Sequence, residues 1–204
     1  PGSGVDCSRF APRVTARSTK RATRVLLAAR LLWDKGLQEY VDAARKLRED
    51  GRHIDFLLAG DPDSGNPASV SSASVREWEK AGLVHWLGHV EDMPTLLESV
   101  DIVVLPSYRE GLPKGLIEAA ACGLPLVTTD VPGCREVVEH GVDGLLVPPR
   151  DAVSLARAIA SLQDDTLLAS RLGKAARAKA VAKFDEKIVI ERTMAVYREL
   201  AALS

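Results

Sequence analysis

The strongest constraint on the fold is an alternation of short apolar segments with longer segments of helical periodicity. The apolar segments are rich in Val, Leu and Ile and are bounded by Gly, Pro or polar residues, which predicts buried strands. The predicted strands are 24–29, 54–59, 83–87, 101–106, 124–129 and 144–148. The predicted helices are 36–50, 73–82, 93–99, 113–122, 134–140, 151–163, 166–183 and 185–202. Such alternation favours an α/β fold with a doubly wound parallel sheet of about six strands and helices on both faces.

The composition is that of an ordinary globular domain. The 204 residues, 46% of them hydrophobic, suffice for a sizeable core, and no apolar run approaches membrane-spanning length. A net charge of −1 gives no electrostatic basis for nucleic-acid binding. The three cysteines have neither metal-ligand spacing nor the even count of a disulfide framework. The first residues lack the features of a secretory signal, so we expect a cytoplasmic location. The sequence shows no dedicated metal cluster, so we also expect a metal-independent reaction, and we expect no cofactor.

Two glutamates, Glu110 and Glu118, flank the turn that follows the predicted strand 101–106. Gly111 lets the chain bend, and Pro113 suits the first turn of a helix. Free N–H groups at a helix start attract phosphate, and Glu118 would stand about 7–8 Å further along the helix, within reach of an attached ribose. Glu110 would face a sugar on the other side of the phosphates. The alternative is that Glu110 is an ordinary loop residue and Glu118 a solvated helix charge.

This E-x7-E segment resembles the signature of retaining GT-B nucleotide-sugar glycosyltransferases of the family 4 type, the group 1 glycosyl transferases. The resemblance implies that Glu110 contacts the transferred sugar and that Glu118 binds the ribose. The family commonly has a second glycine where this chain has Pro113, which removes one N–H donor. The remaining donor-binding positions in the turn are Gly111, Leu112, Lys114 and Gly115.

Two further segments resemble the same family. Residues 25–36, VLLAARLLWDKG, resemble the family's first strand and the turn after it. In the family an Arg and a Lys five residues later hold the donor diphosphate, which implies this role for Arg30 and Lys35. Residues 84–90 resemble the strand and turn beside the donor base, which implies main-chain contacts at His89 and Val90. Arg135, after another strand, is expected to pair with a neighbouring acid. The polar residues 61–74 are expected to form a mobile loop near the mouth of the cleft.

The resemblance covers nearly the whole chain but only half of a GT-B enzyme. It implies an interdomain junction at 1–12, a Rossmann-like donor-binding domain at 13–184 and, at 185–204, a terminal helix that crosses back toward a missing amino-terminal domain. In the family that domain supplies the acceptor contacts. We therefore expect the chain alone to bind donor without efficient transfer.

The implied function is transfer of a hexose or N-acetylhexosamine from a nucleoside diphosphate sugar, with a UDP-sugar favoured, to a glycan or lipid-linked sugar. The spelling of the motif further resembles enzymes of bacterial surface polysaccharide synthesis, capsule or lipopolysaccharide, with contact to the inner membrane surface through the missing domain. Two alternatives stay open: a free-standing nucleotide-sugar binding module without catalysis, and a GT-B sugar epimerase. Neither a G-x-G-x-x-G after the first strand nor a G-x-x-x-x-G-K-[ST] is present, which argues against a dehydrogenase and a P-loop NTPase.

Overall fold

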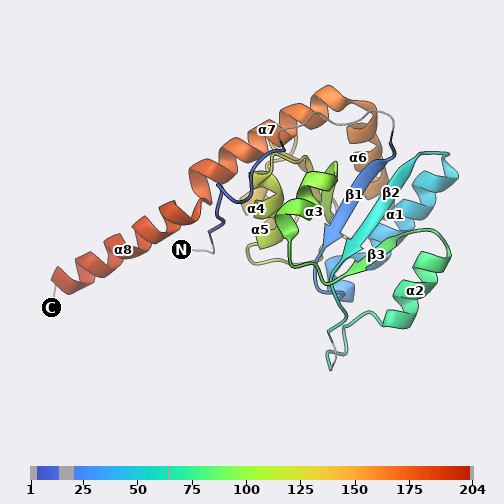
Figure 1. The fold of residues 1–204 in the computed structure, drawn as a ribbon, viewed down its shortest axis with the longest axis horizontal. Coiled ribbons are helices and arrows are strands. Elements are labelled where there is room, and N and C mark those ends of the chain that lie inside the picture. Colours follow the sequence, from blue (N-terminus) through green and yellow to red (C-terminus); the bar gives the residue numbers. More distant parts are fainter. Residues whose placement is uncertain (1–3, 14–20, 64, 203–204) are drawn as a thin grey trace.

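The computed structural model describes residues 4–13, 21–63 and 65–202, and it shows an open parallel sheet with helices on both faces (Figure 1). The six strands lie in the order β3-β2-β1-β4-β5-β6, and every neighbouring pair is parallel. They are β1 (Thr23–Ala28), β2 (Ile54–Ala59), β3 (His85–Gly88), β4 (Ile102–Leu105), β5 (Leu126–Thr129) and β6 (Leu145–Val147). The fold class predicted from the sequence is confirmed.

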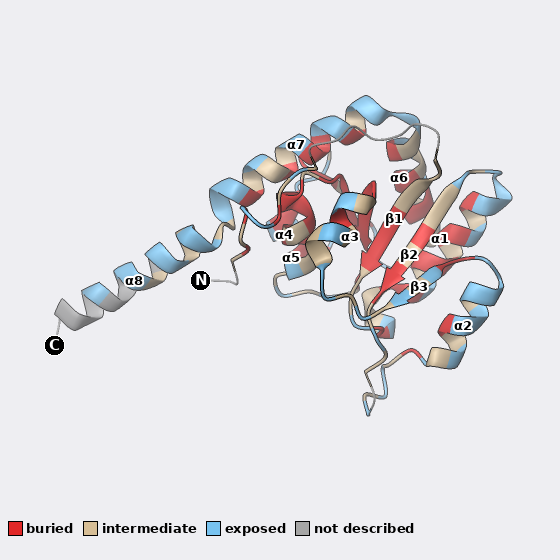
Figure 2. Ribbon diagram, viewed as in Figure 1, coloured by how far each residue is buried: buried red, intermediate tan, exposed pale blue. Residues whose placement is uncertain are grey.

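Helices form the two outer layers. They are the short 3₁₀ turn η1 (Trp33–Lys35) and the α-helices α1 (Leu37–Glu49), α2 (Ser72–Lys80), α3 (Met93–Ser99), α4 (Lys114–Ala121), α5 (Pro132–Val137), α6 (Ala152–Asp164), α7 (Thr166–Lys183) and α8 (Glu186–Ala202). One core cluster joins the sheet to α1 and α6, and a second joins it to α3, α4 and α5. Strands β4 and β5 are buried throughout and β1 and β2 in part, as Figure 2 shows for β1 and β2, whereas the edge strand β3 has no buried residue.

The 3₁₀ turn η1 is not predicted from the sequence, and the other differences from the predicted elements lie at their ends. The predicted helix 134–140 is wrong at both ends: α5 already begins at Pro132, which suits a first helical turn, and it stops before Val138, which is extended. The predicted polar loop 61–74 is shorter, because the Ser71 hydroxyl caps α2 by accepting the N–H of Ser74. Residue 64 of that loop lies outside the described residues.

The strand order reverses between β1 and β4. The chain passes from β1 outward to β2 and β3, and then returns to place β4 against the other side of β1, where Val25 pairs with Ile102. The segments that follow β1 and β4 therefore diverge above the carboxyl edge of the sheet. In open parallel sheets this switch point is where ligands bind.

The amino-terminal segment packs onto the junction of the last two helices. The N–H of Val5 donates to the Phe184 carbonyl, and the N–H of Glu186 donates to the Val5 carbonyl. The Arg177 guanidinium binds the carbonyls of Cys7, Phe10 and Ala121, which fastens the segment to α7 and α4. From this junction α8 extends away from the sheet (Figure 1).

The domain boundaries at 12/13 and 184/185 stay predictions. Residues 1–3 of the predicted junction and 203–204 of the predicted terminal segment lie outside the described residues. Among the helices that the structure describes, none has the length and apolar character needed to cross a bilayer.

Gly36, between η1 and α1, gives the first testable prediction. Its φ is 75°, and a Cβ there would lie 2.1 Å from the Pro106 carbonyl oxygen. Gly51 has the same φ of 75° but nothing within 4 Å, so it is a matched control. We expect Gly51→Ala to cost about 1–2 kcal/mol for the left-handed backbone, and Gly36→Ala to cost about 1–3 kcal/mol more because the Pro106 backbone must move. Urea denaturation measures both, and equal losses would contradict the close approach of the β1 and β4 loops.

Candidate functional site

A cavity of about 200 Å³ opens where the segments after β1 and β4 diverge. Its walls include apolar residues of both strands, such as Leu26 and Val103, together with Met93 and Leu97 of α3. Five of the residues predicted from the sequence to bind donor also line it, namely Arg30, Lys35, Glu110, Lys114 and Gly115. We refer to it as the switch-point cavity.

Lys35 and Glu110 form the closest charged pair in the switch-point cavity. Lys35 Nζ lies 2.7 Å from Glu110 Oε1, and the two side chains are only 18% and 11% exposed. Backbone contacts bring them together, because Gly36 packs against Pro106 and the Tyr108 N–H donates to the Asp34 carbonyl at 2.8 Å. The two residues lie 75 positions apart in the sequence, so the fold places a cation and a carboxylate in one partly dehydrated site.

The amino terminus of α4 faces the same cavity. Pro113 is the N-cap, rather than a residue of the first turn as the sequence predicted, and no side chain caps the helix. The Pro113 carbonyl accepts from Leu116 and Ile117, whereas the N–H groups of Lys114 and Gly115 have no acceptor among the described residues. These N–H groups and the positive end of the helix dipole are suited to an anion.

Glu118 stands one helical turn beyond this helix start. Its Oε1 lies 3.7 Å from Lys114 Nζ, and its side chain is 15% exposed. Burial raises the pKa of Glu118, and the Lys114 ammonium opposes that rise. Because the folded state holds this proton more tightly than the unfolded state does, the ionised carboxylate costs stability above its raised pKa, and the cost disappears as pH falls through it.

Glu118→Gln should therefore separate stability from binding. We expect an unchanged or higher unfolding temperature at neutral pH, since the buried charge is removed. If Glu118 binds the ribose, as the family resemblance implies, loss of a charged acceptor for the hydroxyl groups should make UDP-glucose bind about 10- to 100-fold more weakly. In the wild type, binding should begin to weaken above pH 4.5 on acidification, and Glu118→Gln should lack this step. Calorimetric titrations from neutral to acid pH test this; the same acid step in both proteins would contradict it.

Arg30 is the most exposed of the predicted cations. Its Nη1 lies 3.0 Å from Asp63 Oδ2, and the two side chains are 69% and 31% exposed. Asp63 belongs to the polar loop, which backbone hydrogen bonds hold beside the segment after β1, from Trp33 to Ala68 and from Val70 to Leu31. Sequence reasoning missed Asp63, which lies 33 positions from Arg30.

The remaining predicted residues, Gly111, Leu112, His89 and Val90, do not line the switch-point cavity. Gly111 is exposed and Leu112 packs against the second core cluster. His89 and Val90 follow β3 at the same edge of the sheet but do not line the cavity. Their proposed contact with a donor base stays a prediction.

Arg135 and Gly133 belong to α5, which follows β5 at the carboxyl edge of the sheet. Arg135 Nε lies 2.5 Å from Asp130 Oδ1, which confirms the expected ion pair. Gly133 of α5 belongs to a turn, 131–136, that is expected from the sequence to face the cleft, but its close backbone contact is not predicted. A Cβ at Gly133 would lie 2.2 Å from the Glu110 carbonyl oxygen and 2.3 Å from that of Gly111, so only glycine fits there.

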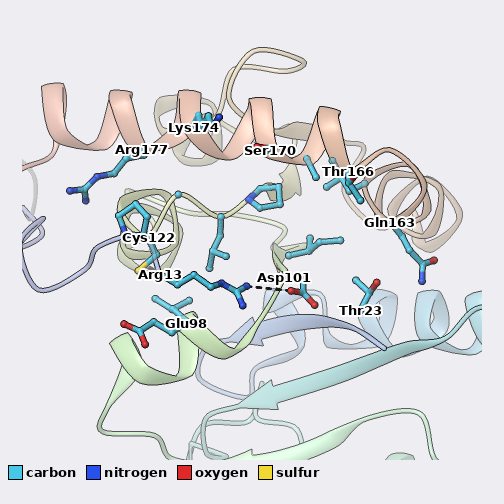
Figure 3. Close-up of a pocket in the computed structure, with 18 of the residues that line it drawn as sticks. Arg13, Thr23, Glu98, Asp101, Cys122, Gln163, Thr166, Ser170, Lys174 and Arg177 are labelled. Atoms are coloured by element: carbon cyan, nitrogen blue, oxygen red, sulfur yellow. Dashed lines mark hydrogen bonds and ion pairs between the residues drawn. The ribbon is translucent and has the colours of Figure 1, made fainter. Parts of the chain in front are cut away.

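A larger cavity, of about 730 Å³, lies at the amino edge of the sheet (Figure 3). Four of its charged groups have protein partners: Arg21 binds Asp101 at 2.7 Å and 2.8 Å, Arg13 binds Asp101 at 3.4 Å, and Arg177 binds the three carbonyls described above. None of the predicted donor-binding residues lines it. The smaller switch-point cavity is therefore the candidate site.

Within the described ranges, no three His, Cys, Asp or Glu side chains gather as a metal-binding group.

Burial raises the pKa of the Cys122 thiol to about 12 and also raises the pKa of Cys134, so both thiols are protonated at neutral pH.

Residues 22–165 match the family model described as glycosyl transferases group 1. The chain belongs to this family. The matched range includes both glutamates of the E-x7-E motif and both predicted diphosphate ligands, Arg30 and Lys35.

Relatives and solved structures agree with this membership of the group 1 glycosyl transferases. The chain is 38% identical over 173 residues to a Campylobacter jejuni enzyme named N,N'-diacetylbacillosaminyl-diphospho-undecaprenol alpha-1,3-N-acetylgalactosaminyltransferase, covering 85% of this chain and 44% of that protein. The sucrose-phosphate synthase of Thermosynechococcus elongatus superposes with a TM-score of 0.86 at 27% identity, covering 99% of this chain and 52% of that one. Anabaena HepE in complex with UDP-glucose superposes with a TM-score of 0.81 at 25% identity, covering 98% and 56%. The chain thus spans about half the length of the relatives it matches.

Proposed function

We propose that this chain is the donor-binding half of a retaining glycosyltransferase that moves a hexose or N-acetylhexosamine from a UDP-sugar to an acceptor. The observation that carries the proposal is the gathering of Arg30, Lys35, Glu110 and the α4 amino terminus in the switch-point cavity. A nucleotide sugar needs three kinds of group along its length. The ribose needs acceptors for its hydroxyl groups, the diphosphate needs cations and N–H donors, and the sugar needs a further acceptor.

Each residue has a defined role in this proposal. Glu118 binds the ribose hydroxyls, and Glu110 orients the transferred sugar. Arg30, Lys35 and the N–H groups of Lys114 and Gly115 bind the diphosphate, whose negative charge grows as the bond to the sugar breaks. Groups that are fixed before the reaction stabilise that charge without reorganising. In this proposal the present half of the enzyme therefore stabilises the departing nucleoside diphosphate.

The acceptor is proposed to be a lipid-linked sugar of bacterial surface polysaccharide synthesis. The support comes from the Campylobacter relative, whose name gives a diphospho-undecaprenol acceptor and an N-acetylgalactosaminyl donor group. HepE, in complex with UDP-glucose, supports a uridine nucleotide. An amino-terminal domain is proposed to bind the acceptor at the inner membrane surface.

Thermal unfolding with UDP, GDP, ADP and their hexose conjugates tests the proposal. Selective binding stabilises the folded state by RT ln(1 + [L]/Kd), about 2.7 kcal/mol at a ligand concentration of 100 times Kd. We expect the 204-residue chain and the natural protein that carries it to be stabilised most by UDP and UDP-sugars. The natural protein should release UDP from the bound sugar nucleotide at a rate that rises with acceptor, whereas an epimerase would release it equally well without acceptor. Absence of a shift with every nucleotide in the natural protein would overturn the proposal.

A further inference from the structure

The loop that carries Glu110 is attached to α1 through Tyr108. The Tyr108 hydroxyl lies 2.8 Å from both Oε1 and Oε2 of Glu39, which belongs to the first turn of α1. The Arg150 guanidinium covers the Tyr108 ring, with Cζ 4.5 Å from the ring centroid. Arg150 reaches this position from a turn with φ 63°, a left-handed conformation that is strained for a residue with a side chain. Three segments distant in sequence thus meet at one phenol ring.

The same loop is joined to the residue before Lys35. The Asp34 carbonyl accepts two hydrogen bonds from the loop, one from the Tyr108 N–H at 2.8 Å and one from the Ser107 hydroxyl at 3.0 Å. Ser107 is fully buried, and its own carbonyl accepts a hydrogen bond from the Thr129 hydroxyl of β5. The backbone at Ser107 and Tyr108 is therefore fixed on two sides, and Glu110 follows two residues later.

We propose that Tyr108, held by Glu39, is a positioning residue that sets the placement of Glu110 against Lys35. The inference rests on the proposed function, because it concerns the residue that orients the transferred sugar. Tyr108 does not line the switch-point cavity, so it acts through the loop rather than on the donor. Without the Tyr108 hydroxyl contact, the loop keeps its two hydrogen bonds to the Asp34 carbonyl but loses its side-chain attachment to α1.

The ionisation of Tyr108 is compatible with this role. Burial and the neighbouring Glu39 carboxylate raise the pKa of Tyr108 to about 12. The phenol therefore stays protonated and donates to Glu39 throughout the neutral pH range. A hydrogen bond to a charged acceptor is stronger than one between neutral groups.

The test measures UDP release and UDP affinity in the natural protein, with whichever UDP-hexose or UDP-N-acetylhexosamine is turned over fastest. We expect Tyr108→Phe to lower kcat by about tenfold, since a charge-assisted hydrogen bond is lost, and to leave the Kd for UDP within about twofold. Glu39→Gln, which keeps an acceptor for the hydroxyl, should fall between Tyr108→Phe and the wild type. In a Glu110→Gln background, Tyr108→Phe should lower kcat no further, because its effect is transmitted through Glu110.

Tyr40→Phe is the matched control. Tyr40 is a buried residue of α1 whose hydroxyl contacts the carbonyls of Val25 in β1 and Leu57 in β2 rather than the Glu110 loop. It should lower the unfolding temperature without lowering kcat. A wild-type kcat in Tyr108→Phe, or an undiminished effect in the Glu110→Gln background, would overturn the positioning role alone. A wild-type protein that binds no nucleoside diphosphate would instead overturn the proposed function and the inference that rests on it.

Discussion

Glu110→Gln in the natural protein should lower the rate of sugar transfer by about 100- to 1,000-fold, equivalent to about 2.7–4 kcal/mol of transition-state stabilisation, while UDP stays bound. The Glu110 carboxylate is 11% exposed and lies where the proposed donor places its sugar, so a neutral amide would orient the sugar hydroxyls less strongly. Lys35 loses its charged partner at the same time, and its ammonium becomes fully available to the diphosphate. UDP affinity should therefore be unchanged or higher, which calorimetry on the variant measures directly.

Glu98→Gln is the control for this experiment. Glu98 belongs to α3, is exposed, and lines the larger cavity at the amino edge of the sheet rather than the switch-point cavity. It should leave both transfer and UDP binding at the wild-type level. Undiminished transfer by Glu110→Gln would remove the role assigned to that carboxylate, whereas parallel loss of transfer and UDP binding would indicate a disrupted site.

Replacing both Arg30 and Lys35 by Ala should weaken UDP binding by at least about 100-fold, since two charge-assisted phosphate contacts are lost at about 1.5–3 kcal/mol each. Binding of uridine, which carries no phosphate, should be unaffected. This pair of ligands separates a lost diphosphate contact from a general distortion of the site. Fluorescence or calorimetric titration gives both affinities.

Arg135→Ala is the matched control, because it removes a cation that is not proposed to bind the diphosphate. Arg135 lies after β5, at the same edge of the sheet, but pairs with Asp130 outside the switch-point cavity. It should leave UDP affinity within about twofold of the wild type, as for an exposed ion pair of small net energy. If Arg135→Ala weakens UDP as much as the double variant does, or if the double variant weakens uridine equally, Arg30 and Lys35 are not the diphosphate ligands.

The sequence predicts the architecture well because local signals agree with the global fold. The predicted bounds of α3 and α7 coincide with the structure, and each helix starts after an aspartate, Asp92 and Asp165, whose side chain accepts from the first turn. The predicted bounds fail for α5, where the strong local signal, Pro132, marks the start and the short helix ends without glycine. Strand order cannot be read from such local signals, since it depends on which loops bring distant strands together.

In the candidate site, too, local spacings could be predicted from the sequence, whereas contacts between distant segments could not. The E-x7-E spacing and the Arg30 to Lys35 spacing are local. The structure brings Arg30, Lys35 and Glu110 to one cavity, whereas Glu118 lies one helical turn beyond the helix start that faces it. The pairing of Tyr108 with Glu39 and the approach of Gly133 to the Glu110 carbonyl join segments with no shared sequence pattern. A glycine in the first turn of a helix is a weak signal of close backbone contact, and only the folded chain shows which backbone it contacts.

In the described part of the chain, each cation around the switch-point cavity is already matched by a carboxylate: Arg30 by Asp63, Lys35 by Glu110 and Lys114 by Glu118. Ligand entry is then an exchange of ionic partners rather than the neutralisation of a bare positive surface. Added salt competes with the resting pairs as well as with the bound diphosphate, so affinity should depend on ionic strength less steeply than the number of cations implies. Inorganic phosphate or a polyanion would have to displace Glu110 and Glu118 without offering them any hydroxyl groups. We therefore expect the resting ion pairs to favour anions that also carry sugars over simple anions in the switch-point cavity.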